Sequence, residues 1–153
     1  RLCSMARVDV VSGFSRTSPS GIGTGVAHAV RMTFARQQLG LEGEALAANE
    51  LERLGYQILE RRYRSRFGEI DLIAQDEGTV VFVEVKTKTD GRFGEPAEMV
   101  TAQKQRRLVA MAEEYASGHA LHSTPCRFDV VAVDASIQPA LITVYKDAFR
   151  PGW

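Results

Sequence analysis

At 153 residues, the chain has the length of one domain with a core of ordinary size. Its hydrophobic content of 44% and charged content of 25% are typical of a soluble globular protein, and no apolar run approaches the roughly 18 residues of a membrane span. The formal net charge of zero excludes a uniformly basic nucleic-acid-binding protein. Any binding of a polyanion must therefore come from local basic patches and a bound cation. We expect no membrane partner.

The first 31 residues differ in composition from the rest. They hold four arginines against one acid, Asp9, so 15 of the 19 basic and 18 of the 19 acidic residues lie beyond them. Because this stretch is rich in Ser, Gly and Thr and lacks periodicity, we predict a disordered extension over 1–31 and one domain over 32–153. Met32 is then the expected native start, and the residues before it would come from a translation start assigned too far upstream. An organellar transit peptide is the alternative.

Hydrophobic periodicity predicts the elements of the domain. A helix is expected over residues 34–54, then strands over 56–63, 67–74 and 79–87, a second helix over 101–116, and strands over 127–133 and 141–145. Three successive strands favour antiparallel neighbours, whereas the helix between strands favours a parallel pairing. We therefore predict an α/β fold with a mixed β-sheet flanked by helices. Cys3 and Cys126 show no pairing or metal-ligand spacing, which favours a reducing cytoplasm.

Charged side chains interrupt two of the strands that otherwise have buried character. Asp71 lies in the strand at 67–74, and Glu84 and Lys86 lie in the next one, where isolated charge costs several kcal/mol. Side chains two apart on a strand share a face, so Glu84 and Lys86 point to one side and Val83 and Val85 to the other. Two carboxylates and an amine that converge at a sheet surface predict a metal site with an adjacent cation.

The residue types of this site suit phosphodiester hydrolysis. Mg²⁺ (or Mn²⁺) prefers oxygen ligands and keeps several waters, so Asp71, Glu84 and the backbone carbonyl of Val85 are sufficient ligands. A divalent cation supplies both an activated water and charge stabilisation on the phosphoryl oxygens. Lys86 is predicted to hold that water or to offset phosphate charge. Glu44, in the first helix, is a candidate third carboxylate or general base.

These residues and their flanks resemble a known family. Asp71 followed by Glu84-Val85-Lys86, in the order helix, three strands, helix, strand, is similar to the PD-(D/E)xK restriction-endonuclease-like superfamily. Over residues 41–149 the amino-acid sequence resembles the YraN family of small bacterial proteins, which are related in fold to Holliday-junction resolvases. The matching segments are Gly43-Glu44, Arg61-Arg62-Tyr63-Arg64, Gly68-Glu69-Ile70-Asp71-Leu72-Ile73, Val81-Phe82-Val83-Glu84-Val85-Lys86, Phe93-Gly94, Lys104 and Arg127-Phe128-Asp129-Val130-Val131.

The resemblance implies a restriction-endonuclease-like mixed sheet and assigns roles within it. Glu44, Asp71, Glu84 and Lys86 fall on the superfamily's helix glutamate, metal aspartate, metal glutamate and catalytic lysine. Nucleic acid is the implied partner, with DNA favoured over RNA, and binding is implied more firmly than cleavage. A homodimer stays open, because many nucleases of this fold are dimers. One departure concerns Arg62, which stands where the family's strand is expected to carry asparagine.

Basic residues near the site have two interpretations. Arg62, Arg64 and Arg66 alternate near a strand end, and with Lys104 they are predicted to contact the phosphates of a nucleic acid. A charged edge strand that resists aggregation explains the arginines equally well. Glu69 shares a strand face with Asp71, so it is either a further ligand or, as we favour, the partner of a nearby arginine.

The leading hypothesis is thus a metal-dependent endonuclease that cleaves DNA or RNA by in-line attack of a water activated by the cation. One rival is a nucleic-acid-binding module that retains the fold but does not turn over. An assembly or adaptor protein is the other rival. The buried Glu84 and Lys86 pair argues against a decayed site, since a site free to drift would lose buried charges.

Overall fold

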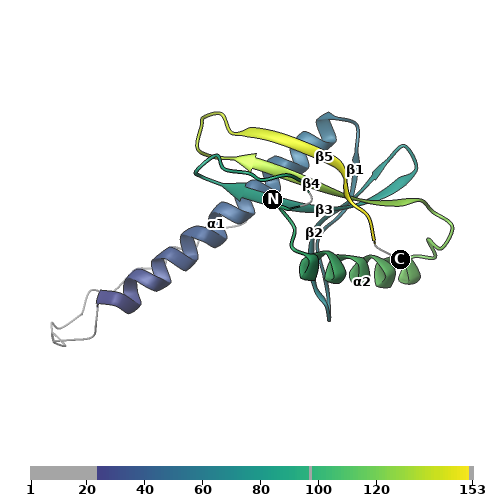
Figure 1. Ribbon diagram of the computed structural model, residues 1–153, viewed down its shortest axis with the longest axis horizontal. Coiled ribbons are helices and arrows are strands. Elements are labelled where there is room, and N and C mark those ends of the chain that lie inside the picture. The colour runs from purple at the N-terminus through teal and green to yellow at the C-terminus, as the bar shows by residue number, and fades with distance from the viewer. Residues whose placement is uncertain (1–23, 97, 152–153) are drawn as a thin grey trace, which may run out of the picture.

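The computed structural model describes residues 24–96 and 98–151 of the chain (Figure 1). The described residues form two helices and five strands, which confirms the predicted α/β class. Their order is α1 (Thr24–Arg53), β1 (Gln57–Ser65), β2 (Gly68–Asp76), β3 (Thr79–Lys88), α2 (Ala102–Gly118), β4 (Cys126–Asp134) and β5 (Leu141–Phe149).

The five strands form one mixed sheet in the order β1-β2-β3-β4-β5. β3 and β4 run parallel, and every other neighbouring pair is antiparallel. Short turns join the antiparallel strands, whereas the parallel pair needs the longer connection that contains α2. The predicted mixed sheet is therefore confirmed, and β3 lies at its centre.

The two helices pack against opposite faces of the sheet (Figure 1). On one face, Ala48 and Leu51 of α1 join a core cluster with Val81 and Val83. On the other face, the buried side of α2 packs against the alternate residues of the same strands; this cluster includes Leu108, Met111, Tyr115, Ile73, Phe82 and Val130. The alternation of side chains along β3 explains how one apolar strand serves both cores.

Helix α1 begins ten residues before the predicted start at residue 34. No glycine or proline interrupts residues 26–39, and alanine, arginine and glutamine favour helix there. The side chains of residues 29–38 are exposed along this first part, which extends away from the sheet in Figure 1. The predicted boundary at residues 31 and 32 therefore falls inside α1, while residues 1–23 of the predicted extension lie outside the described residues.

Strand β5 also continues further than predicted, to Phe149 instead of residue 145. Its last residue is buried and stacks on Phe128 of β4, with the ring centroids 4.8 Å apart. A short polar stretch, Lys146-Asp147, conceals this extension in the sequence. Among the helices that the structure describes, none is both long and apolar enough to cross a bilayer.

Candidate metal-binding cleft

The candidate site opens where β2 and β3 stop pairing. Their backbone pairs run from Asp76 and Thr79 to Leu72 and Val83. Continuing that register places Asp71 opposite Glu84, and directly opposed residues of antiparallel strands point to the same face. Beyond the last pair, the Val85 N–H donates to Oδ2 of Asp71 at 2.7 Å. A carboxylate thus replaces a strand carbonyl as the partner of this amide, which anchors Asp71 at the mouth of the opening.

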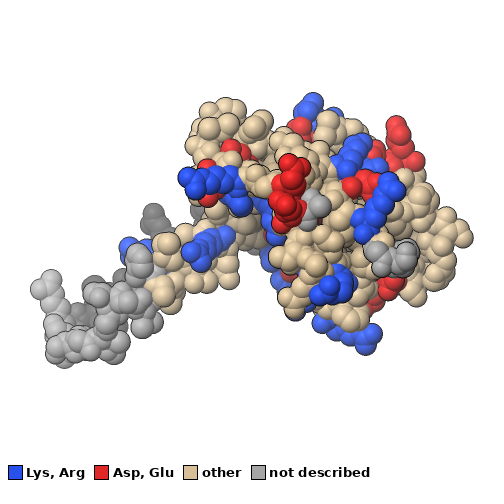
Figure 2. All heavy atoms as spheres, in the orientation of Figure 1, with Lys and Arg blue, Asp and Glu red and all other residues tan. Residues whose placement is uncertain are grey.

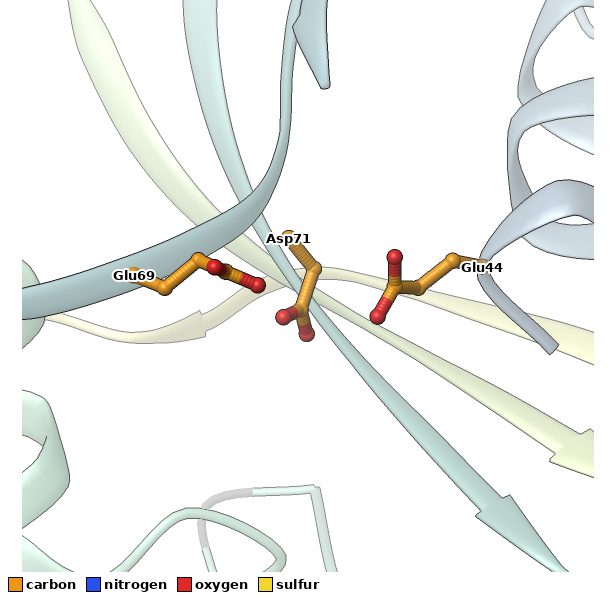
Figure 3. Close-up of side chains that lie close together, drawn as sticks. All are labelled: Glu44, Glu69 and Asp71. Carbon is orange, nitrogen blue, oxygen red and sulfur yellow. The ribbon is translucent and has the colours of Figure 1, made fainter. Parts of the chain in front are cut away.

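Helix α1 supplies the third acid because Gly43 lets it approach β3 closely. A Cβ at this position would overlap the hydroxyl of Thr87. The close approach carries the next residue, Glu44, to the opening, and in Figure 3 its side chain points from α1 toward Asp71. The sequence contained this signal in the pair Gly43-Glu44, but only the packing of α1 on the sheet explains it.

Three carboxylates converge at this point. Glu44, Glu69 and Asp71 each offer one oxygen within 4.8 Å of the others, and Asp71 lies between the two glutamates (Figure 3). Magnesium holds oxygens at about 2.1 Å, so two oxygens on opposite sides of one ion are about 4.2 Å apart. Three oxygens cannot all lie opposite one another: neighbouring ligands of an octahedral ion are about 3 Å apart, so the side chains would need to close in by up to about 2 Å. All three offer carboxylate oxygens, so the donor set fits the chemistry of a divalent cation such as Mg²⁺ or Mn²⁺.

Glu84 does not belong to that group of three, because two lysines hold it. It is 5% exposed, with Lys86 Nζ 2.8 Å from Oε1 and Lys104 Nζ 3.1 Å from Oε2. The second contact is an ion pair without a well-oriented hydrogen bond, which leaves Oε2 buried and without a hydrogen-bond partner among the described residues. Thr101 caps α2 by accepting the Lys104 N–H, and this start of the helix directs Lys104 to Glu84.

The predicted row of three arginines is divided. Arg62 and Arg64 both bind Glu69, at 3.0 and 2.7 Å, and Arg62 also lies 3.8 Å from Oε2 of Glu44. The pairing of Glu69 with arginines agrees with the preferred interpretation of its sequence position. Arg66 lies elsewhere, with its guanidinium 4.7 Å from the centre of the Phe67 ring. The structure thus brings two of the three arginines to the acidic cluster.

The acids differ in their electrostatic surroundings. Burial, reinforced by the charge of Glu84, raises the pKa of Asp71 from 3.8 to about 7. Burial also raises the pKa of Glu44. Burial acts in the same direction on Glu69, but the hydrogen bonds from Arg64 and Arg62 outweigh it and hold that pKa below its ordinary value. The charged form of Asp71 is therefore the one that a bound cation would stabilise most, and Asp71 has no ion-pair partner among the residues described.

Part of this cluster lines a cleft of about 710 Å³, whereas Glu69 and its arginines lie outside the lining. Glu44, Asp71, Glu84, Val85 and Lys86 line it together, as do Arg36 and Lys88, which were not predicted. Arg36, Gly40 and Glu44 recur at four-residue steps on one face of α1, a spacing that is informative once the helix is known to start early. Val85 contributes its N–H to Asp71, while its carbonyl as a ligand stays a prediction, as do the catalytic roles.

The comparisons with known proteins agree on one family. The model of "Uncharacterised protein family UPF0102" matches residues 43–133. A UPF0102 protein of Symbiobacterium thermophilum is 52% identical over 98 residues, 64% of this chain and 83% of the relative. One from Anaeromyxobacter dehalogenans is 51% identical over 121 residues, 76% of this chain and 90% of the relative. A third, from Moorella thermoacetica, is 44% identical over 120 residues, 77% of this chain and all of the relative.

Proposed function

Since this chain belongs to the UPF0102 family, the YraN family that its sequence resembles, we propose that it binds nucleic acid and hydrolyses phosphodiester bonds with Mg²⁺ or Mn²⁺. The family name states no reaction, so the argument comes from the cleft. The mixed sheet with a glutamate-bearing helix packed on one face fits the restriction-endonuclease-like fold that the resemblance implies. DNA is the preferred substrate of this proposal.

One observation carries the proposal: acids and a lysine from three separate elements line the same cleft. Glu44 comes from α1, Asp71 from β2, and Glu84 with Lys86 from β3. Buried charges of this kind are costly, and a structural role for them would require each to be paired. Within the described part of the chain, Asp71 accepts a hydrogen bond only from the Val85 N–H, which leaves acceptor capacity for a ligand.

The chemistry follows from what each residue can do. A bound divalent cation would lower the pKa of an attacking water and offset the charge that develops on the phosphate. Asp71 and Glu44 would hold that cation, and Glu84, opposite Asp71, lines the same cleft. Lys86, anchored 2.8 Å from Glu84 and one third exposed, is placed to donate a hydrogen bond to the water or to a phosphate oxygen.

The charge distribution supports binding of the substrate at the cleft alone. In Figure 2, basic and acidic side chains are interspersed over the visible face, so that face offers no continuous cationic track. In the cleft, Arg36, Lys86 and Lys88 lie beside the acids. Phosphate contacts from these cations, together with a bound dication, would hold a nucleic-acid backbone at the carboxylates.

The decisive experiment incubates the protein with supercoiled, branched and single-stranded DNA, and with RNA, in Mg²⁺, Mn²⁺ or EDTA. We expect products with metal only, and a loss of at least 100-fold in rate for Asp71→Ala and Glu84→Ala, since metal ligands of this kind are essential. Glu77→Gln removes a carboxylate in the exposed turn between β2 and β3 and serves as the matched control. Cleavage that survives both alanine variants would refute the assignment.

A specific observation also favours the rival without turnover. Glu84 and Glu69 are each held by two cations, so much of the cleft is charge-balanced without a metal. A binding module of this kind would retain its affinity for nucleic acid in EDTA. Binding in EDTA without products under any metal condition would support this rival over the nuclease.

A further inference from the structure

Arg62 occupies an unusual place in the strand next to the acidic cluster. Its neighbours Arg61 and Tyr63 pair with Leu72 and Ile70, so Arg62 lies across from Asp71. Its φ of +55° falls in the left-handed region, which costs most residues about 1 kcal/mol and suits asparagine far better. The backbone thus favours the asparagine that the family resemblance implies here, and this chain instead places a cation there.

The guanidinium of Arg62 bridges two of the three clustered carboxylates. It donates to Oε1 of Glu69 at 3.0 Å and lies 3.8 Å from Oε2 of Glu44. These are the two outer members of the cluster, on either side of Asp71 in Figure 3. A cation that enters between them would draw on the same two carboxylates that Arg62 now contacts, and the two positive charges repel each other.

The hold of Arg62 on the cluster is weak enough to be reversed. Its side chain is 42% exposed, and exposed ion pairs contribute only about 0 to 1 kcal/mol. The Lys86 and Glu84 pair, whose acid is 6% exposed, is far better protected from water. Arg62, which unlike Arg64 contacts both outer carboxylates, is therefore a cation that can leave the cluster at low cost, and its planar guanidinium is suited to a phosphate once it is free.

We propose that Arg62 is a displaceable internal counter-ion: it screens Glu44 and Glu69 in the metal-free protein, and a divalent cation entering the cluster expels it. This inference rests on the proposed metal site and adds a regulatory step to it. Arg62 lowers the affinity for metal and becomes available to the substrate backbone only after the metal is bound.

Titration calorimetry with Mn²⁺ tests the proposal without any activity measurement. Arg62→Asn removes the charge and suits the left-handed backbone, so it should remain folded. Arg61→Asn is the matched control, because it removes the same charge from the adjacent residue, whose partner is Glu52 outside the cluster. We expect Mn²⁺ to bind Arg62→Asn about three- to tenfold more tightly than wild type, with less difference at high salt and no such gain for Arg61→Asn.

Each outcome decides the question. Equal affinity of wild type and Arg62→Asn, or weaker binding by the variant, would overturn the counter-ion role while leaving the metal site intact. An equal gain in Arg61→Asn would also overturn it, since the effect would then be one of net charge. No Mn²⁺ binding by any of the three proteins would instead remove the metal site itself. Arg62→Gln, which keeps more of the side-chain length, must repeat the result.

Discussion

The two ends of β2 carry charge networks that differ in how completely the charges are paired. At one end lies the cleft with Asp71, and at the other lies a closed network around Asp129, whose side chain is fully buried. Arg127 binds Asp129 at 2.9 Å and Asp76 at 2.6 Å, and the Asp147 N–H donates to Asp129 at 2.9 Å. Every charge in the closed network has a protein partner.

The pKa shifts record the same difference. Hydrogen bonds from Arg127 and Lys146 lower the pKa of Asp76, because they stabilise its charged form. Burial raises that of Asp71 to about 7, since its one hydrogen bond comes from a backbone amide. A buried charge whose partners are all within the chain serves the fold, whereas a partly buried acid left short of a cation is suited to a ligand.

Breaking the closed network should have the largest effect on stability. Arg127→Met leaves Asp129 buried without its cation, which should lower the free energy of unfolding by about 3–5 kcal/mol in urea titrations. Lys86→Met is the comparison in the cleft, where Lys104 still pairs with the buried Glu84, and we expect a smaller loss of about 1–3 kcal/mol there. Equal losses in the two variants would contradict the distinction between the networks.

Displacing α1, which carries Glu44 to the cleft, should have the next largest effect on stability. Gly43→Ala places a Cβ on the Thr87 side chain, so we expect a loss of about 1–3 kcal/mol and weaker Mn²⁺ binding as α1 shifts with Glu44. Gly40→Ala, one turn earlier with nothing within 4 Å, should instead gain up to about 1 kcal/mol. Thr87→Gly should restore much of the stability lost in Gly43→Ala, as a double-mutant cycle would show.

The raised pKa of Asp71 predicts a stability that falls with pH. The folded protein keeps a proton on this acid up to about pH 7, whereas the unfolded chain releases it near pH 4. Stability from this group is therefore lost as the pH rises from about 4 to 7. Asp71→Asn, which can still accept the Val85 N–H, should be about 1–2 kcal/mol more stable than wild type at pH 8 in EDTA. Urea titrations at pH 5 and 8 measure this, with Glu77→Gln as the unchanged control.

The smallest effect concerns the competition between protons and metal. Because Asp71 must lose its proton to bind a cation, the Mn²⁺ affinity of wild type should fall by about tenfold for each pH unit below about 7. Calorimetry between pH 5.5 and 8 checks this slope. A constant affinity across that range would mean that Asp71 is not a ligand. The charges of the cleft and those of the closed network would then differ less than proposed.

The sequence alone placed part of the cleft, and for a local reason. The two-residue period of a strand puts Glu84 and Lys86 on one face, and a short turn brings Asp71 to the neighbouring strand. Such relations span few residues and hardly depend on the rest of the fold. The mixed α/β sheet followed likewise from hydrophobic periodicity, although α1 and β5 were predicted too short because exposure and polar residues hide their ends.

Only the tertiary structure decided which charges meet. Helix packing at Gly43 and Thr87 brings Glu44 to the cleft, and the start of α2 brings Lys104 to Glu84. Arg62 contacts Glu69 in the folded chain, and its contact with a phosphate stays a prediction. These encounters join residues from separate elements, and they depend on the separation of packed layers and on the length of each side chain. Periodicity cannot encode those distances, because it describes one element at a time.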